Sequence, residues 1–369
     1  MDEKQRLRYM KQALFWAAKG AGWVAPNPKV GAVIVKQGRI IGWGYHRRFG
    51  ALHAEVEAIA HCRKQQEDPR GAVMFVSLEP CCHQGKTGPC TEAIAAAGIA
   101  HVEIATLDEC PLVAGKGAAW LKKNGITINL DCCETQARRL NAGFFKLQKE
   151  GLPQVILKWA QSLDAKLAWP KNDNQRWITN EKSRWHLHQL RSQCGAVLVG
   201  IGTVLADDPL LTARLNRKSF QPLRVVLDSR LRIPLESQLV QTAKIFPLLI
   251  YTLDQNDALK KRKAQSLQNL GCEVITVGAD NSGVDLKKVL ENLGRRGVTD
   301  VLVEGGACVL KAFWQKNLAD KLMAYIAPVI VGSAPEIPAI DFAQPSQYTQ
   351  NVSVQHFEGD TLIEVFLRE

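Results

Sequence analysis

The chain has 369 residues, 46% of them hydrophobic, and a formal net charge of +11. This composition excludes a disordered chain, and no apolar run approaches the roughly 20 residues of a membrane span, so we expect two globular domains and no membrane segment. The charge indicates an anionic partner, either nucleic acid or a phosphorylated small molecule, but without a block of like charges it fits an ordinary soluble surface equally well.

The charged start MDEKQRLRYM lacks the apolar stretch of a signal peptide, so we expect a cytoplasmic protein. Ten cysteines in a reducing compartment are not expected to form a disulfide framework. Most should be reduced core thiols, Cys62, Cys194, Cys272 and Cys308 among them. Clustered cysteines instead indicate metal binding or catalysis.

The first half of the chain predicts alternating helices and strands. A helix over residues 5–19 precedes a β-hairpin, whose strands Val30–Val35 and Arg39–Tyr45 are joined at Lys36-Gln37-Gly38. Helix and strand then alternate, beginning and ending with a helix, over His53–Lys64, Ala72–Leu78, Cys90–Ala97, His101–Leu107, Gly117–Lys123, Gly125–Leu130 and Cys133–Lys149. This order predicts a sheet sandwiched between helices.

The pattern restarts near residues 149–153, where we place a boundary between domains 1–149 and 150–369. The second half predicts another α/β domain, closed by a hairpin over Val352–Leu367. Its other strands, with helices between many of them, are predicted at Gln154–Ala160, Ala196–Gly200, Leu223–Asp228, Phe246–Thr252, Glu273–Val277, Asp300–Glu304 and Lys321–Ala327.

Three residues of the first half have the chemistry of a catalytic zinc site. His53 opens a helix, Cys81 follows a strand, and Cys90 begins the next helix, where the helix dipole favours a thiolate. An imidazole and two thiolates suit a Zn²⁺ whose fourth position is left for water. Glu55 is the expected proton carrier. Residues i and i+2 of a helix point about 200° apart, so His53 and Glu55 converge only if His53 lies at the helix entry.

The order His-x-Glu, Pro-Cys, Cys is typical of zinc deaminases, although eight residues separate these two cysteines instead of two. A structural zinc site stays open as an alternative, because Cys82 or His83 offers a fourth ligand.

Two glycine motifs of the second half follow predicted strands. Gly200-Ile201-Gly202 lacks the third glycine of a Rossmann fingerprint. Gly305-Gly306 would let a phosphate approach a helix start, and a plain glycine-rich turn fits the sequence equally well.

Several motifs together resemble the bifunctional deaminase–reductase family of riboflavin biosynthesis. They are the segments 26–31, His53–Glu55 and Glu79–Cys90, the last with an inserted Gly-Lys-Thr loop. The resemblance implies an α/β fold in both halves: a cytidine-deaminase-like three-layer αβα domain that holds one Zn²⁺, and a dihydrofolate-reductase-like domain that uses NADPH. It also implies deamination of 2,5-diamino-6-(5-phosphoribosylamino)pyrimidin-4(3H)-one, then reduction of the ribosyl side chain of 5-amino-6-(5-phosphoribosylamino)uracil to ribityl.

The resemblance assigns the remaining site residues as well. Those around the deaminase substrate are Asn27, His46, His83, Lys86, Thr87 and Asp108. Those that bind NADPH are Ala160, Trp177, Thr203, Asp207, Ser229 and Gly306. Those near the reductase substrate are Lys158, Gln175, Arg191, Leu211, Arg214 and Glu304, and the forked donors of the two arginines suit a ribose phosphate.

The chain departs from the family pattern at several positions. Cys110 stands where a substrate-contacting Asn is usual, Ala165 where Gly is usual, and Gln175 where Ser is typical. The stretch Trp169–Asn174 is about one residue longer. Substrate contacts in these loops are therefore expected to differ from the family pattern.

Two other functions compete with this one. A tRNA- or nucleic-acid-editing zinc deaminase with an RNA-binding second domain would need a basic, aromatic-laced surface, but the charges of the second half are mixed in sign. A zinc-stabilised binding protein would not need Glu55. We therefore expect phosphoribosylaminopyrimidine substrates, neither nucleic acid nor membrane as a partner, and by resemblance a homo-oligomer, either a dimer or a tetramer.

Overall fold

The structure, a computed structural model, describes residues 1–83, 88–109, 114–170, 175, 177–216, 218–253, 257–280, 283–332 and 351–368. The chain divides into two compact units, Met1–Gly151 and Leu152–Arg368. Within the described ranges, no helix is both long enough and apolar enough to cross a bilayer.

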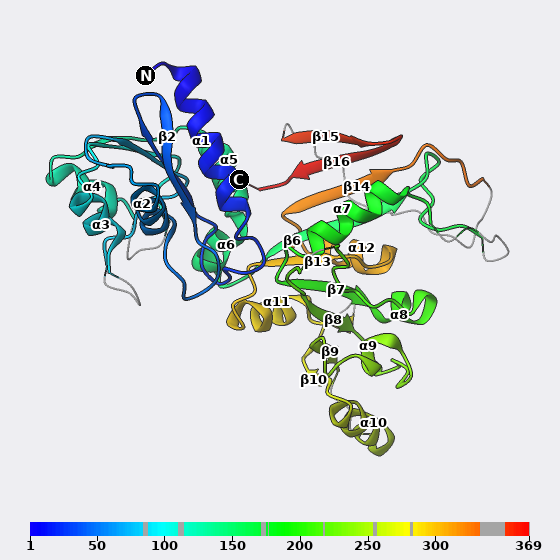
Figure 1. Cartoon of the computed structure of the whole chain (residues 1–369). Coiled ribbons are helices and arrows are strands. Elements are labelled where there is room, and N and C mark those ends of the chain that lie inside the picture. The colour runs from blue at the N-terminus through cyan, green and yellow to red at the C-terminus, as the bar shows by residue number, and fades with distance from the viewer. Residues whose placement is uncertain are drawn as a thin grey trace. The chain divides into compact units, whose positions relative to one another are not determined.

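Five strands form the sheet of the first unit, in the order β2-β1-β3-β4-β5, and its edge strand β2 is labelled in Figure 1. β1 (Gly31–Lys36) and β2 (Arg39–Tyr45) pair antiparallel as the predicted hairpin. β1 also pairs antiparallel with β3 (Val73–Val76), beyond which β4 (His101–Ile104) and β5 (Thr127–Asn129) continue in parallel. The carboxyl ends of three parallel strands thus meet at one edge, where ligands bind in open α/β sheets.

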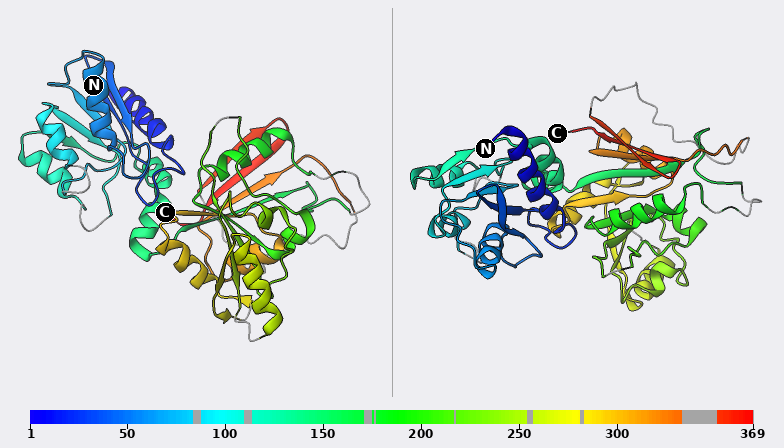
Figure 2. Two further views of the ribbon diagram at one scale, coloured as in Figure 1. Left: turned by 60° about the horizontal axis from the view of Figure 1, so that its bottom comes forward. Right: turned by 45° about the horizontal axis from the view of Figure 1, so that its top comes forward.

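Helices cover both faces of this sheet. α2 (Ala54–Lys64), α3 (Cys90–Ala96) and α4 (Lys116–Lys123) bury apolar side chains against one face. α1 (Glu3–Ala18) and α5 (Glu134–Leu140) pack on the other, as the two views of Figure 2 also show for α1. The predicted three-layer sandwich is confirmed.

The predicted last helix of this unit is interrupted. It ends as α5 and restarts as α6 (Ala142–Glu150), with Asn141 between them at φ −107° and ψ 14°. The fully buried Asn141 amide accepts from the backbone N–H of Lys29 at 2.8 Å and donates to its carbonyl at 3.0 Å. The side chain therefore bonds to a distant loop and fixes the break beside the segment that leads into β1.

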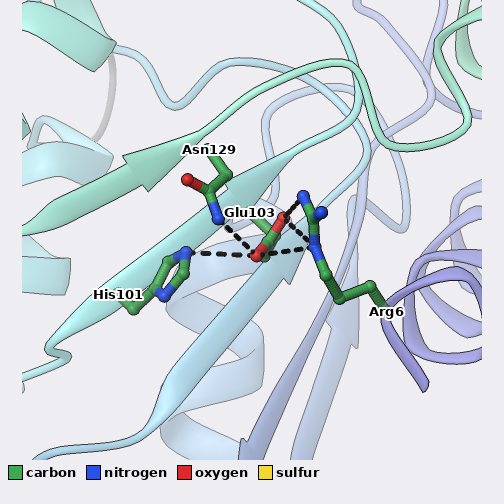
Figure 3. A network of polar contacts seen from close by, with 4 residues as sticks. All are labelled: Arg6, His101, Glu103 and Asn129. Atoms are coloured by element: carbon green, nitrogen blue, oxygen red, sulfur yellow. Dashed lines mark hydrogen bonds and ion pairs between the residues drawn. The ribbon is translucent and has the colours of Figure 1, made fainter. Parts of the chain in front are cut away.

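A buried carboxylate joins α1 to β4 and β5. Glu103 is 2% exposed, and its carboxylate receives Arg6 Nη2 at 2.7 Å, Asn129 Nδ2 at 3.0 Å and His101 Nε2 at 3.1 Å (Figure 3). Burial disfavours the charge, but the hydrogen bonds from these three partners outweigh it and lower the pKa of Glu103 to about 2. Glu103 therefore stays ionised and ties the N-terminal helix to the sheet.

Nine strands form the sheet of the second unit, in the order β10-β9-β8-β7-β13-β6-β14-β16-β15. The first seven in this order run parallel: β10 (Glu273–Thr276), β9 (Leu248–Thr252), β8 (Leu223–Leu227), β7 (Ala196–Gly200), β13 (Asp300–Val303), β6 (Gln154–Gln161) and β14 (Lys321–Ile326). β16 (Asp360–Phe366) and β15 (Val352–Phe357) add the predicted hairpin antiparallel at one edge. The sequence did not predict a small separate pair, β11 (Ala279–Asp280) and β12 (Gly283–Val284).

Helices cover both faces of this sheet too. The larger core lies under α7 (Glu181–Arg191), α8 (Ile201–Asp207), α9 (Gln238–Gln241) and α10 (Ala258–Asn269). The opposite core lies under α11 (Leu286–Arg295) and α12 (Ala307–Gln315). The prediction of a second α/β fold is confirmed.

The nine described cysteines are all free thiols. Cys62, Cys194 and Cys272 are buried as expected, but Cys308 is exposed. It lies in the first turn of α12, whose buried side chains are Leu310 and Phe313, so its own side chain is left outside the core.

The turn after β6 contains one of the departures from the family pattern. Asp164 accepts from Ser162 Oγ at 2.6 Å and from the backbone N–H groups of Val331 and Gly332 at 3.0 and 2.8 Å. The following Ala165 has a φ of +62°, in the left-handed region that glycine adopts without cost. The positive φ explains why glycine is usual at this position. Alanine adopts the same φ only with a strained backbone.

Candidate active sites

The three predicted zinc ligands converge at the carboxyl edge of the first sheet. His53 is the N-cap of α2, with extended backbone at φ −75° and ψ 160°, which satisfies the condition for meeting Glu55. Its Nδ1 lies 3.5 Å from Cys81 Sγ and 3.2 Å from Cys90 Sγ. The three ligand atoms all lie within 4.8 Å of one another, which fits a single zinc ion.

The two thiols of this cluster differ in acidity. Hydrogen bonds from Cys90 and His53 lower the pKa of Cys81 to about 4 although burial opposes this, and the Cys90 backbone N–H donates to Cys81 Sγ at 3.4 Å. The Cys90 pKa is raised well above its ordinary value because Cys90 shares a proton with Cys81 and is buried. The two thiols thus titrate as one pair, whose first proton is lost more readily than that of an isolated thiol.

Glu55 is the second residue of α2 and is buried beside this cluster. Burial, with the charge of Cys81, raises its pKa to about 7. A carboxyl that gains and loses a proton near neutral pH is suited to carry one between a water and a leaving amine.

The helix that carries Glu55 is held close against its neighbouring strand. A Cβ added to Gly44 of β2 would come within 2.4 Å of the backbone nitrogen of Ala58 in α2.

A cavity of about 350 Å³ opens onto this cluster, which is large enough for a small ligand. Asn27, His46, His83 and Asp108 line it together with His53, Glu55 and Cys81. Two further candidates, Lys86 and Thr87, lie outside the described residues, as does Cys110.

His46 is held in one protonation state in this cavity. Its Nδ1 lies 3.0 Å from the Leu52 carbonyl, and its Nε2 lies 3.2 Å from Asn27 Nδ2. Burial lowers the pKa of His46, so the ring is neutral, donating from Nδ1 and accepting at Nε2. The Asn27 amide is thereby oriented in the cavity.

Sequence reasoning missed Glu79, which also lines this cavity. Its carboxylate accepts from the backbone N–H groups of Asp108, Gly115 and Ala118 at 3.2, 2.8 and 3.0 Å. Glu79, which follows β3, thus holds the backbone of Asp108 and caps the N-terminus of α4. An acidic residue between a strand and Pro-Cys was the available signal.

Sequence reasoning also missed the aromatic walls of this cavity. Phe49 and Phe144 line it, and Phe49 is half exposed. Both give the cavity apolar faces that suit a flat heterocycle. Neither residue lies in a local pattern that would have revealed it.

The second unit contains a cavity of about 490 Å³ at the carboxyl ends of β6, β7 and β13. Ten of the twelve predicted reductase residues line it: Lys158, Ala160, Trp177, Arg191, Thr203, Asp207, Leu211, Arg214, Glu304 and Gly306. Gln175 and Ser229 are described but do not line it.

An ion pair spans this cavity. Arg191 Nε and Nη2 donate to the two carboxylate oxygens of Glu304 at 2.7 and 2.8 Å, and Nη1 donates to the Thr212 carbonyl at 3.2 Å. Burial opposes the charge on Glu304, but Arg191 keeps its pKa below the ordinary value. The forked donor that suits a phosphate is thus engaged with Glu304 in this structure.

Other features of the cavity indicate a binding surface. The buried Leu211 has a φ of +55°, a strained conformation that is concentrated at functional sites. Gly306 is the N-cap of α12 and has no side chain there, so a phosphate can approach the helix start. Burial, then Arg191 and Arg214, lower the pKa of His188 to about 4, so its ring is neutral beside the cavity.

Tyr325 and Arg184 also line the cavity and were missed. Tyr325 comes from β14, which was predicted as a strand without a site residue, and Arg184 from α7, where it is part-buried. Their places follow from the pairing of β14 with β6 and from the packing of α7, neither of which a local pattern reveals.

Two family models match the chain. The cytidine and deoxycytidylate deaminase zinc-binding region matches residues 3–106, and the RibD C-terminal domain matches residues 153–363.

Similar proteins are found across nearly the whole length. The chain is 41% identical to the riboflavin biosynthesis protein RibD of Aquifex aeolicus, covering 88% of this chain and 87% of that protein. It is 36% identical to RibD of Escherichia coli, covering 88% of each. Among solved structures, it is similar to the diaminohydroxyphosphoribosylaminopyrimidine deaminase/5-amino-6-(5-phosphoribosylamino)uracil reductase of Thermotoga maritima, with a TM-score of 0.84, 34% identity and 99% of each chain covered.

Proposed function

The chain belongs to the RibD family of riboflavin biosynthesis, and on this premise we propose that its first unit carries out the deamination and its second unit the reduction. The protein is a bifunctional zinc-dependent deaminase and NADPH-dependent reductase. Its substrates are the diaminopyrimidinone phosphoribosyl compound and then the deaminated uracil. The similarity of both halves to this family does not support a nucleic-acid-editing deaminase.

The observation that carries the deaminase assignment is the buried Glu55 beside the His53, Cys81 and Cys90 cluster. Zinc held by these three residues would lower the pKa of a water enough for it to lose a proton near neutral pH. The resulting hydroxide can attack the amine-bearing ring carbon. Glu55, buried beside this cluster, would accept a proton from the attacking water and pass it to the departing amine.

The cavity residues orient the pyrimidine for this step. The Asn27 amide, fixed by His46, and Asp108, whose N–H is held by Glu79, offer hydrogen bonds to the ring edge. His83 lies at the same cavity. We assign Lys86 and Thr87 to the phosphoribosyl group, because a mobile cation and a hydroxyl suit its oxygens.

In the second unit we assign Ala160, Trp177, Thr203, Asp207, Ser229 and Gly306 to NADPH. NADPH, when bound, supplies the hydride for the sugar carbon. The exposed start of α12 at Gly306 and the neighbouring Thr203 support a cofactor phosphate there.

We assign the substrate side of this cavity to Lys158, Gln175, Arg191, Leu211, Arg214 and Glu304. Because Arg191 is engaged with Glu304, its role is to hold that carboxylate toward the substrate, and Arg214 meets the ribose phosphate. Lys158 presents its ammonium to the sugar.

A mass measurement tests both assignments. When zinc-loaded protein acts on the diaminopyrimidinone substrate without NADPH, the mass of the substrate should rise by about 1 Da, because an amine becomes a carbonyl. With NADPH present, the mass of the product should rise by about 2 Da more. Glu55→Gln should retain zinc and lose deamination by about 10²–10⁴-fold, while still reducing added deaminated intermediate. Glu57→Gln on the same helix is the matched control and should keep both activities.

Removing zinc with a chelator should abolish only the first mass change, and adding zinc should restore it. If zinc-loaded protein gives no first mass change, the deaminase assignment is wrong.

We further propose a cytoplasmic homo-oligomer, a dimer or tetramer, that needs neither nucleic acid nor membrane. None of the nine described cysteines is in a disulfide, as expected of a protein in a reducing compartment. Light scattering after size exclusion measures the oligomeric state, and a monomer at micromolar concentration would contradict this proposal.

A further inference from the structure

The reductase cavity contains an ammonium that lacks the usual protein partner. Within the described part of the chain, the Lys158 ammonium forms no hydrogen bond or ion pair. Burial lowers the Lys158 pKa, and Glu304 offsets this only in part, because its carboxylate is bonded to Arg191. What lies against the ammonium is the ring of Tyr325, whose centroid is 5.2 Å away.

This contact follows from the strand register. β14 runs parallel to β6, with Met323 opposite Lys158 and Tyr325 opposite Ala160. Tyr325 therefore lies on the same sheet face as Lys158, two residues further along, beneath the cavity. Its side chain is 1% exposed, yet it forms part of the cavity wall. A cation within about 6 Å of a ring centroid is attracted to the ring face, and more strongly when water is excluded.

The ring itself is held by its hydroxyl. Tyr325 Oη lies 2.7 Å from His186 Nδ1, and the His186 ring stacks on Phe357 with centroids 4.8 Å apart and planes 27° apart. Burial lowers the pKa of His186 and raises that of Tyr325, so both groups are neutral. The neutral imidazole and the hydroxyl share this hydrogen bond, which fixes the ring plane from its far end.

We propose that Tyr325 is a positioning residue for the reduction: its ring holds the Lys158 ammonium toward the substrate, and His186 braces the ring. A lysine stem has four rotatable bonds, and an ammonium without a carboxylate partner would otherwise be mobile. The ring restricts the ammonium without using its three donors, which stay available for the sugar. This proposal rests on the assignment of Lys158 to the reductase substrate.

Steady-state reduction of 5-amino-6-(5-phosphoribosylamino)uracil by the full-length protein tests it. Tyr325→Leu, which removes the ring, should lower reductase kcat/KM about tenfold. Tyr325→Phe, which removes only the hydroxyl, should lower it about threefold. Deamination by the same samples should not change. Tyr251→Phe is the matched control, since it removes a buried hydroxyl that bonds Asn292 Oδ1 at 2.8 Å away from the cavity, and should keep wild-type kinetics.

A double-mutant cycle tests the brace. His186→Phe keeps a ring on Phe357 but loses the hydrogen bond to Tyr325, so Tyr325→Phe combined with His186→Phe should cost no more than the worse single variant. Additive losses would overturn the brace. If Tyr325→Leu does not fold, Tyr325→Met, which also removes the ring, takes its place in the kinetic test.

A direct readout follows the lysine itself. The groups that face Lys158 are Glu304 after β13, Arg191 on α7 and Tyr325 on β14. Because the ring stabilises the ammonium, Tyr325→Leu should shift the pH midpoint of Lys158 acetylation downward, with the exposed Lys287 unchanged. Wild-type kcat/KM or an unchanged midpoint in Tyr325→Leu would refute the proposal, whereas an inactive wild-type reductase would refute only the proposed function.

Discussion

Replacing Glu103 by Gln should destabilise the first unit by an amount that depends on pH. The Glu103 pKa is about 2, against an ordinary value of 4.5. Each tenfold change in proton affinity is worth about 1.4 kcal/mol, so the bonds of Arg6, His101 and Asn129 to the ionised carboxylate contribute about 3 kcal/mol. Because the folded-state pKa is depressed, this contribution is complete above the unfolded pKa and is lost as the pH falls from 4.5 toward 2.

This difference is measured by unfolding wild type and Glu103→Gln in urea and monitoring the unfolding through hydrogen exchange of peptides from α1 and β4. We expect a loss of about 3 kcal/mol at pH 7 that shrinks steadily below pH 4.5. Glu57→Gln breaks an exposed ion pair with Arg47 and should cost less than about 1 kcal/mol at either pH. An equal cost of Glu103→Gln at pH 3 and pH 7 would refute the reasoning, because the network would then act through shape and not through charge.

Three further substitutions have defined outcomes. Gly117→Ala would put a Cβ 2.0 Å from the Pro80 carbonyl oxygen and displace α4, so deaminase kcat/KM should fall at least about tenfold with the reductase unchanged; equal losses in both would contradict this. Ala165→Gly should relieve the positive φ and stabilise the second unit by about 0.5–1 kcal/mol, seen as a higher melting temperature in calorimetry. Arg191→Leu strands the buried Glu304 carboxylate and should cost about 3–5 kcal/mol in urea unfolding, part of which the added Glu304→Leu should recover.

Much of the fold could be predicted because apolar periodicity and turn residues are local. The hairpin of β1 and β2, the positions of the seven further strands of the second unit and the closing hairpin all follow from such patterns, but the parallel pairing of those seven strands does not. The zinc cluster was also predictable, since His53, Cys81 and Cys90 stand at element ends that a parallel sheet brings to one edge.

Contacts between distant segments could not be predicted. Glu304 lies 113 residues from Arg191, and nothing near either residue specifies their pairing. At the break between α5 and α6, the Asn141 amide bonds to the backbone of Lys29, which lies 112 residues away in the sequence. Tyr325 reads as one more apolar strand residue until the register of β14 on β6 is known.

Within the described residues, each cavity is lined by one unit alone. Fusing the two catalysts into one polypeptide fixes their ratio at one to one at every level of gene expression. The cellular pool of deaminated intermediate is then set by the two turnover rates and not by the relative abundance of two proteins. Natural variation around Glu55 or Lys158 would change that pool directly, so selection on either site is constrained by the speed of the other.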